Sequence, residues 1–122
     1  MILADTSIWI DHFRSGDPQL SSLLADGSVL MHPFVLGEMA CGNLRNRKVV
    51  LELLADLPHA IVATEAEVLD FIEHHFLMGR GIGYVDAHLL ASVSLSDSAR
   101  LWTRDRRLEA AAATLDVSFT AN

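Results

Sequence analysis

The sequence contains a single cysteine, Cys41, and a single lysine, Lys48, among its 122 residues. One cysteine cannot form an internal disulfide, so the fold does not require an oxidising compartment. No run of 18 apolar residues is present to cross a membrane, and no basic segment precedes Asp5 as it would in a signal peptide. We therefore expect a cytoplasmic protein.

Positive charge is also scarce, because 9 Lys and Arg face 16 Asp and Glu, for a formal net charge of -7. This balance alone argues against binding to nucleic acid, since phosphate contacts come from Lys and Arg. However, seven of the nine basic residues lie in or near two short segments. Both segments could be either solvated helix surface or phosphate-binding surface. They comprise Arg45, Arg47 and Lys48 in the first, and Arg104, Arg106 and Arg107, preceded by Arg100, in the second.

Apolar residues are abundant for so short a chain, at 51% of the sequence, with a mean hydropathy of +0.30. A chain of 122 residues is expected to form one domain over residues 1–122 and to bury roughly two-thirds of its unfolded surface. The apolar excess predicts that a partner covers part of the surface. We expect a homodimer, a hetero-oligomer, or both.

Short apolar runs alternate with helical patterns along the chain. Pro33 fits the first turn of a helix, and Thr64 to Glu67 has the spacing of a capping box. Parallel strands need helical crossovers, so the alternation predicts an α/β fold with a parallel sheet and helices on both faces. Strands are expected at 1–4, 28–32, 59–63, 100–103 and 117–119, and helices at about 6–13, 18–27, 33–44, 49–57, 64–79, 84–95 and 105–113.

Four acidic residues, Asp5, Glu38, Asp86 and Asp105, lie far apart in the sequence, and the first three fall in stretches that are otherwise typical of a core. Burying an ionised carboxylate costs roughly several kcal/mol unless a positive group accompanies it. Few basic residues are near these acids, so a divalent cation is the simplest partner. Asp5 and Asp105 follow predicted strands, which places them at the carboxyl edge of the sheet, where ligands bind in such folds.

Three of the acids also have an ordinary structural interpretation. Asp5, Asp86 and Asp105 stand at predicted turns or helix starts, where the helix dipole favours a negative charge. Glu38 is predicted to share an apolar helix face with Phe34. Only their joint presence favours a metal site for Mg²⁺, or for Mn²⁺, which carboxylates suit. Such a cluster is typical of phosphodiester hydrolases, in which one ion activates water and the same or a second ion, roughly 3.5–4 Å away, steadies the leaving oxygen.

At four places the sequence resembles the PIN-domain ribonucleases, and within them the VapC toxins of bacterial toxin–antitoxin pairs. The matching segments are Asp5–Asp11, Glu38 in its helix, Asp86–Ala91 and Leu101–Asp105, and the resemblance covers essentially the whole chain. It implies a PIN-like three-layer α/β/α fold, endoribonuclease activity and a VapB-type antitoxin partner. The residues carried over are Asp5, Glu38, Asp86 and Asp105 as the catalytic metal site, with Thr6, Ser7 and Thr103 as polar support.

The expected reaction is hydrolysis of RNA by metal-activated water without use of the 2′-hydroxyl, leaving 5′-phosphate and 3′-hydroxyl ends. Arg104, Arg106 and Arg107 would supply phosphate contacts if they border the acidic pocket, and so could Arg45, Arg47 and Lys48. A non-catalytic module that docks a basic partner on the acidic pocket stays open as an alternative. Two folds that phosphorylate an aspartate do not fit. An enzyme of the haloacid-dehalogenase type needs a second acid at the position of Ser7, and a receiver domain needs a lysine after a late strand, where this sequence has none.

The remaining distinctive residues are predicted to be structural. The six histidines and the glycines at 79, 81 and 83 lack the spacing of a metal site or a phosphate-binding loop. Cys41 is predicted to be a small packed side chain. Trp9, Phe34 and Phe76 are interpreted as core residues rather than as platforms on which nucleobases stack.

Overall fold

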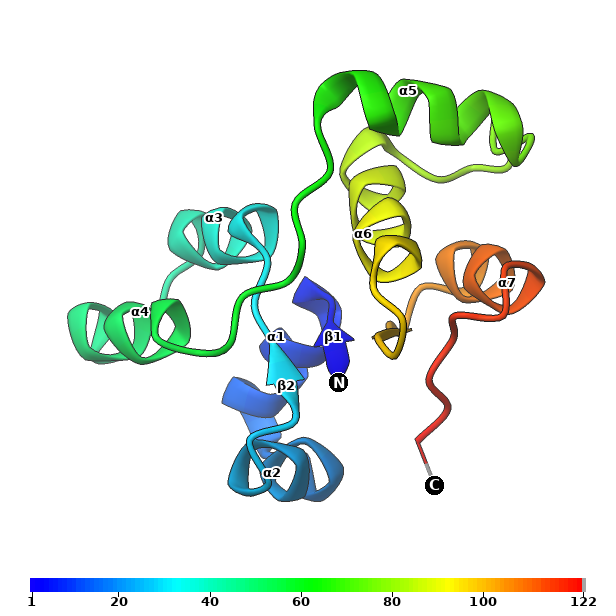
Figure 1. Cartoon of the computed structure of the whole chain (residues 1–122). Helices are drawn as coiled ribbons and strands as arrows, with labels where there is room; N and C mark the ends of the chain where they lie inside the picture. Colours follow the sequence, from blue (N-terminus) through cyan, green and yellow to red (C-terminus); the bar gives the residue numbers. More distant parts are fainter. Residues whose placement is uncertain (122) are drawn as a thin grey trace.

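A parallel sheet of three short strands lies at the centre of the computed structural model, which describes residues 1–121 (Figure 1). The strands are β1 (Ile2–Ala4), β2 (Val29–Leu30) and β3 (Arg100–Trp102), in the order β2-β1-β3. Ile2 pairs with Val29 on one side and with Arg100 on the other. Every residue of β1 is buried, as expected of the central strand of a sheet covered on both faces.

Seven helices surround this sheet within residues 1–121. Helices α3 and α4 lie on one side of the strands, and α5, α6 and α7 lie on the other (Figure 1). The predicted α/β fold with a parallel sheet is therefore confirmed. The helices are α1 (Thr6–Ser15), α2 (Pro18–Ala25), α3 (Pro33–Cys41), α4 (Arg47–Ala55), α5 (Glu65–His74), α6 (Tyr84–Leu95) and α7 (Arg106–Thr114). None of them is long and apolar enough to span a membrane.

Helix α6 is the most deeply buried helix and packs on both β3 and α5. Its residues 87–93 form a continuous buried run, because all of them except His88 are apolar or small, on every side of the helix. The first turn of α6 is thereby held against the carboxyl edge of the sheet. Helix α1 approaches the same edge from β1, because only Asp5 separates the two elements.

The predicted signals for helix starts are confirmed. Pro33 occupies the first turn of α3. The hydroxyl of Thr64 accepts a hydrogen bond from the Glu67 amide at 3.1 Å, and the Glu67 carboxylate accepts one from the Thr64 amide at 2.8 Å. These interactions form between residues three apart, so they are readable from the sequence alone.

Two predicted strands, at 59–63 and 117–119, are wrong. Each makes only an isolated bridge, between Met31 and His59 and between Leu101 and Ser118. Residues 59–63 leave the sheet towards α5 after this contact, and Ile61 and Val62 are about half exposed, at 49% and 50%. A single bridge does not hold a strand on the edge of the sheet.

Two helices end three or more residues earlier than predicted. Helix α5 ends at His74 rather than near residue 79, because Phe76 adopts a left-handed backbone angle (φ 53°) that a helix cannot continue. Helix α3 ends at Cys41 rather than near residue 44, and the Gly42 amide donates to the Met39 carbonyl there. The chain then reaches α4 through an exposed turn.

Several burial predictions are also wrong. Helix α3 turns Val35 and Met39 towards the core, so residues 34, 38 and 41 lie on other faces of the helix. Phe34 is 36% exposed, and Cys41 and Glu38 are exposed. Phe76 is 75% exposed, whereas Trp9 is confirmed as a core residue at 1%.

Candidate active site

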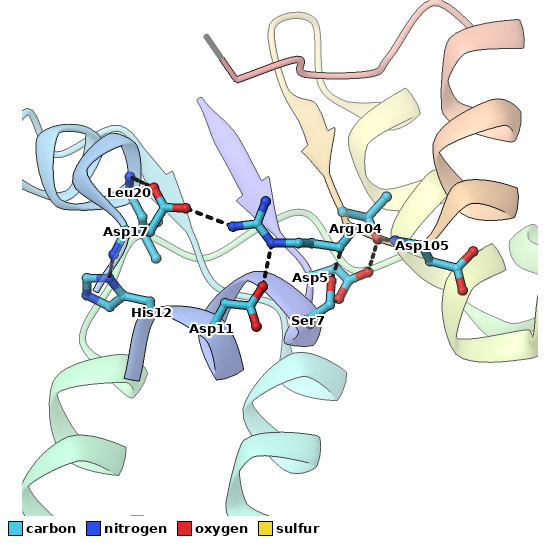
Figure 2. Close-up of polar contacts among 9 residues, drawn as sticks. Asp5, Ser7, Asp11, His12, Asp17, Leu20, Arg104 and Asp105 are labelled. Carbon is cyan, nitrogen blue, oxygen red and sulfur yellow. Dashed lines mark hydrogen bonds and ion pairs between the residues drawn. The ribbon is translucent and has the colours of Figure 1, made fainter. Parts of the chain in front are cut away.

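Asp5 is the best fixed of the four acids. It leaves β1 and caps α1, and its carboxylate accepts from the Ser7 amide at 2.7 Å and from the Thr103 hydroxyl. Its own amide donates to the Trp102 carbonyl at 2.9 Å, so it is tied to the neighbouring strand β3. Asp5 is only 9% exposed. Figure 2 shows it with the residues around it.

Asp105 is linked to Asp5 through Thr103. The Asp105 amide donates to the Thr103 hydroxyl at 3.0 Å, while the same hydroxyl donates to Asp5. The Asp105 carboxylate caps α7 by accepting from the amides of Arg107 and Leu108, both at 2.9 Å. Asp105 is nevertheless exposed, so one side of its carboxylate stays accessible.

Glu38 reaches the site from α3 and accepts a hydrogen bond from the Thr6 hydroxyl at 2.8 Å. Thr6 stands directly after Asp5, so this bond ties α3 to the start of α1. The predicted burial of Glu38 is wrong, because α3 uses another face for the core. An exposed carboxylate is solvated by water and needs no cation. The expectation that a buried carboxylate needs a positive partner therefore applies to Asp5 and, in part, to Asp86.

Asp86 is partly buried in the first turn of α6 and accepts from the Gly83 amide at 3.1 Å. Burial raises the pKa of the Asp86 carboxyl above its usual value, and the negative charges of Asp5, Asp105 and Glu38 raise this pKa further. The Gly83 hydrogen bond acts in the opposite direction. The fold therefore brings the other three acids within electrostatic reach of Asp86.

These acids do not form a closed ligand shell. No group of three or more His, Cys, Asp or Glu side chains within residues 1–121 is arranged to hold a metal ion. The carboxylates are instead engaged in helix caps and hydroxyl contacts. The donor set still fits Mg²⁺ or Mn²⁺, because these ions take oxygen ligands and retain several waters, and because a cation would relieve the repulsion around Asp86.

Arg104 is engaged within the protein. Its Nε donates to Asp11 at 2.5 Å and its Nη2 donates to Asp17 at 2.8 Å, as Figure 2 shows. The hydrogen bond to Asp11, with the further one to Asp17, raises the pKa of Arg104 above its usual value. The Arg104 amide also donates to the Ser7 hydroxyl at 3.1 Å. This geometry links α1 and α2 to the loop that carries Thr103 and Asp105, and it favours a structural role over the predicted phosphate contact.

Arg106 and Arg107 are exposed in the first turn of α7, directly after Asp105. The Arg107 side chain passes against Gly81, where an added Cβ would lie only 2.6 Å from its Cδ and Nη1 atoms. Gly81 has a positive φ of 78° and belongs to the loop that leads into α6 and Asp86. Glycine is therefore favoured here by the backbone angle, and its lack of a Cβ allows the close approach of the flexible Arg107 side chain.

The first basic segment lies on the other side of the acids. Arg47 donates to the carbonyls of Gly42, at 3.0 Å, and Ala40, so it closes the end of α3. Arg45 lines a cavity of about 420 Å³ between α1 and the α3–α4 region, together with Glu38 and Arg14. Lys48 is exposed. Sequence reasoning missed Arg14, because an isolated arginine near the end of a helix carries no signal of what faces it.

Comparisons with known proteins agree with this arrangement. The PIN domain family model matches residues 2–113 of the chain. The chain is similar to ribonuclease VapC32 of Mycobacterium tuberculosis, in the strains CDC 1551 / Oshkosh and ATCC 25618 / H37Rv. It is 51% identical to each over 119 residues, which are 98% of this chain and 96% of the relative. The match to the family model and the 51% identity over nearly the whole chain show that it belongs to the PIN-domain family and to its VapC ribonucleases.

Proposed function

We propose that this protein is a divalent metal-dependent endoribonuclease, and that it acts on cytoplasmic RNA as the toxin of a toxin–antitoxin pair. The observation that carries the proposal is the electrostatic coupling of Asp86 to Asp5, Asp105 and Glu38 at the carboxyl edge of the sheet. Both relatives reported above are described as ribonucleases. Within residues 1–121, no basic side chain donates a hydrogen bond to these four carboxylates. Such a group of acids is suited to bind a metal ion together with a phosphate.

Asp5 and Asp86 are the acids best placed to hold Mg²⁺ or Mn²⁺. Asp5 is oriented by the Thr103 hydroxyl and the Ser7 amide, so it needs little reorganisation on binding. The ion would supply Lewis acidity and a water of lowered pKa. Glu38 and Asp105, which are exposed, would then orient a water molecule or complete the coordination from opposite sides. Cleavage would leave 5′-phosphate and 3′-hydroxyl ends.

Basic residues around the site would offset the overall negative charge. Arg106 and Arg107 follow Asp105 directly, and Arg45 shares a cavity with Glu38. Long-range repulsion by a protein of net charge -7 is overcome only by such local positive charge. These residues are therefore our proposed contacts for RNA phosphates, whereas Arg47 and Arg104 are largely engaged by the protein itself.

Apolar surface supports a protein partner. Ile10 and Phe13 on α1, and Val49 and Leu53 on α4, are each between 44% and 64% exposed. Ile10 and Phe13 line the cavity of about 420 Å³ that contains Glu38. Phe13 and Leu53 line a more apolar one of about 170 Å³ beside Trp9. We propose that a VapB-type antitoxin covers this surface and thereby closes access to Glu38, and that the toxin also forms a homodimer.

The decisive experiment incubates the purified chain with single-stranded RNA in the presence of Mg²⁺ or of excess EDTA, and determines the chemistry of the new ends. Cleavage is expected with Mg²⁺ and lost with EDTA. The melting temperature should rise with Mg²⁺ or Mn²⁺, because an ion that binds only the folded state stabilises it. Unchanged cleavage in EDTA would overturn the metal mechanism, and RNA left intact under all conditions would favour the non-catalytic docking module.

A further inference from the structure

Three aromatic rings from α3 and α6 meet beside the acidic site. The ring of Phe34 packs on that of His88 with centroids 4.6 Å apart, and the ring of Tyr84 packs on His88 at 4.7 Å. Both pairs are close to perpendicular, with interplanar angles of 65° and 88°. Edge-to-face packing of this kind fixes the orientation of the rings.

These rings differ sharply in exposure. His88 is only 4% exposed, whereas Phe34 is 36% and Tyr84 is 44% exposed. The buried imidazole therefore supports two aromatic side chains that remain partly open to solvent. Ring surface held in this way can contact a ligand at little cost in side-chain freedom, because the rotamers are already restricted.

Both exposed rings come from the helix segments that carry acids of the site. Phe34 precedes Glu38 by four residues on α3, so the two side chains are neighbours on the helix surface. Tyr84 begins α6, and Asp86 lies in the same first turn. The charge of Glu38 acts on Asp86, which places the second half of α3 and the first turn of α6 around one site.

The same cluster contains unsatisfied polar atoms. Within residues 1–121, Nδ1 of His88 and Nε2 of the fully buried His32 have no hydrogen-bond partner, and the two rings lie 6.5 Å apart. Buried polar atoms are nearly always satisfied in folded proteins, so an unpaired pair of them beside a functional site calls for an explanation. Both atoms are buried, so a ligand stacked on Phe34 or Tyr84 would not contact them, and only the exposed rings are available to bind it.

We propose that Phe34 and Tyr84 form a base-binding subsite that stacks an unpaired nucleobase of single-stranded RNA next to the scissile phosphate. This inference rests on the proposed ribonuclease function and adds how the substrate is held. Stacking on aromatic side chains accepts any base, and it requires a base that is not paired in a duplex. The subsite would therefore select single-stranded segments, and it would place the phosphate that adjoins the stacked base among the four acids.

The test compares variants that keep a ring with variants that keep only apolar bulk. Affinity for oligoadenylate, oligouridylate and an abasic ribose-phosphate oligomer of the same length is measured in an Asp5→Asn background, which prevents cleavage. Phe34→Leu and Tyr84→Leu should each weaken binding of the base-containing oligomers by about 5- to 100-fold, the range for loss of one stacked base. Tyr84→Phe and Phe34→Tyr should bind like the parent, and all variants should bind the abasic oligomer equally.

Phe76→Leu is the matched control, because Phe76 is 75% exposed and is not one of the rings that pack on His88. It should leave RNA affinity unchanged. Circular dichroism of each variant checks that the fold is kept. If a leucine variant fails to fold, the parent must still bind the base-containing oligomers more tightly than the abasic oligomer for the subsite to stand.

The outcomes separate this inference from the function on which it rests. If the chain with Asp5 intact cleaves RNA but the leucine variants bind RNA as tightly as their parent, the subsite is wrong and the ribonuclease stands. If the chain neither binds nor cleaves RNA, both proposals fail. If the leucine variants keep RNA affinity but lose a protein partner, Phe34 and Tyr84 belong to a protein interface instead.

Discussion

The two sides of the acidic site are built differently. On the side of β3 and α7, Asp5, Thr103 and Asp105 are joined by hydrogen bonds, and Arg104 ties their loop to Asp11 and Asp17. On the side of α3 and α6, Glu38 is exposed and the aromatic rings are partly open. This difference fits the proposed function, in which the first side would be organised before binding and the second would receive the substrate.

The largest expected effect contrasts one acid from each side. Asp5→Asn keeps the size of the side chain and removes the charge on the fixed side, so RNA cleavage should fall by orders of magnitude. Glu38→Gln, on the open side, should lower cleavage much less, since an exposed acid is more easily replaced by water. Initial rates at saturating Mg²⁺ measure both. Equal losses in the two variants would remove the proposed contrast between the two sides.

The folding of variants at the acids, including Asp86→Asn, checks that the loss of cleavage is not a loss of structure. Asp86→Asn removes a charge that is crowded by three other acids, so its melting temperature without metal should equal or exceed that of the parent. A fold that is lost in Asp5→Asn or Asp86→Asn, even with Mg²⁺ present, would mean that the acids are structural.

A second prediction concerns the pH dependence of stability on the open side. His32 is fully buried, and its Nδ1 accepts the Phe34 amide hydrogen bond at 3.1 Å. Burial, together with the charge of His88, lowers the pKa of His32 from 6.5 to about 4. The unfolded state therefore binds more protons between pH 6.5 and about 4. Stability should fall by up to about 3 kcal/mol as the pH drops through this window, and this contribution should level off below it.

His32→Asn isolates the contribution of this histidine. Asparagine at the same N-cap position can accept the Phe34 amide hydrogen bond but does not titrate. Urea unfolding of both proteins from pH 7 to pH 4 should give curves that diverge, with the parent losing more stability. Parallel curves would show that His32 does not titrate as inferred.

A smaller effect is expected for the Arg104 ion pairs on the fixed side. Arg104→Gln removes contacts with Asp11 and Asp17, and partly exposed pairs contribute about 0.2–1 kcal/mol each. Stability should therefore fall by about 1 kcal/mol and Mn²⁺ affinity should weaken, while RNA affinity should keep its salt dependence. Arg106→Gln, on the exposed start of α7, is the control and should leave stability and Mn²⁺ affinity unchanged. A flatter salt dependence in Arg104→Gln would restore the phosphate contact predicted from the sequence.

The smallest effects should come from the exposed basic residues. Replacing Arg106 and Arg107 together by Ala should reduce the slope of log affinity against log salt by roughly 0.7 per lost contact with single-stranded RNA. The same measurement on Arg45→Ala and Lys48→Ala shows whether the α4 side also contacts RNA. Unchanged slopes in both sets would mean that neither segment meets the RNA and would favour the docking module.

Local sequence signals predicted the elements that place the acids. Asp5, Asp86 and Asp105 were each recognised at a turn or helix start, and all three accept amide hydrogen bonds at the start of a helix. The Thr64 capping box was likewise correct. The predicted strands at 59–63 and 117–119 failed because strand length depends on how far two distant segments stay together, and here each pair meets at one bridge.

The sequence by itself determined where along the chain the three strands of the sheet, the helices and the acids lie, because caps, turns and apolar periodicity act between residues a few positions apart. Only the tertiary structure decided that Glu38 and Phe34 are exposed, since this depends on which face of α3 meets the core. It alone gave Arg104 its partners Asp11 and Asp17, which are 93 and 87 residues away in the chain. Contacts of that range form when the sheet aligns its strands, and no local pattern in the sequence encodes them.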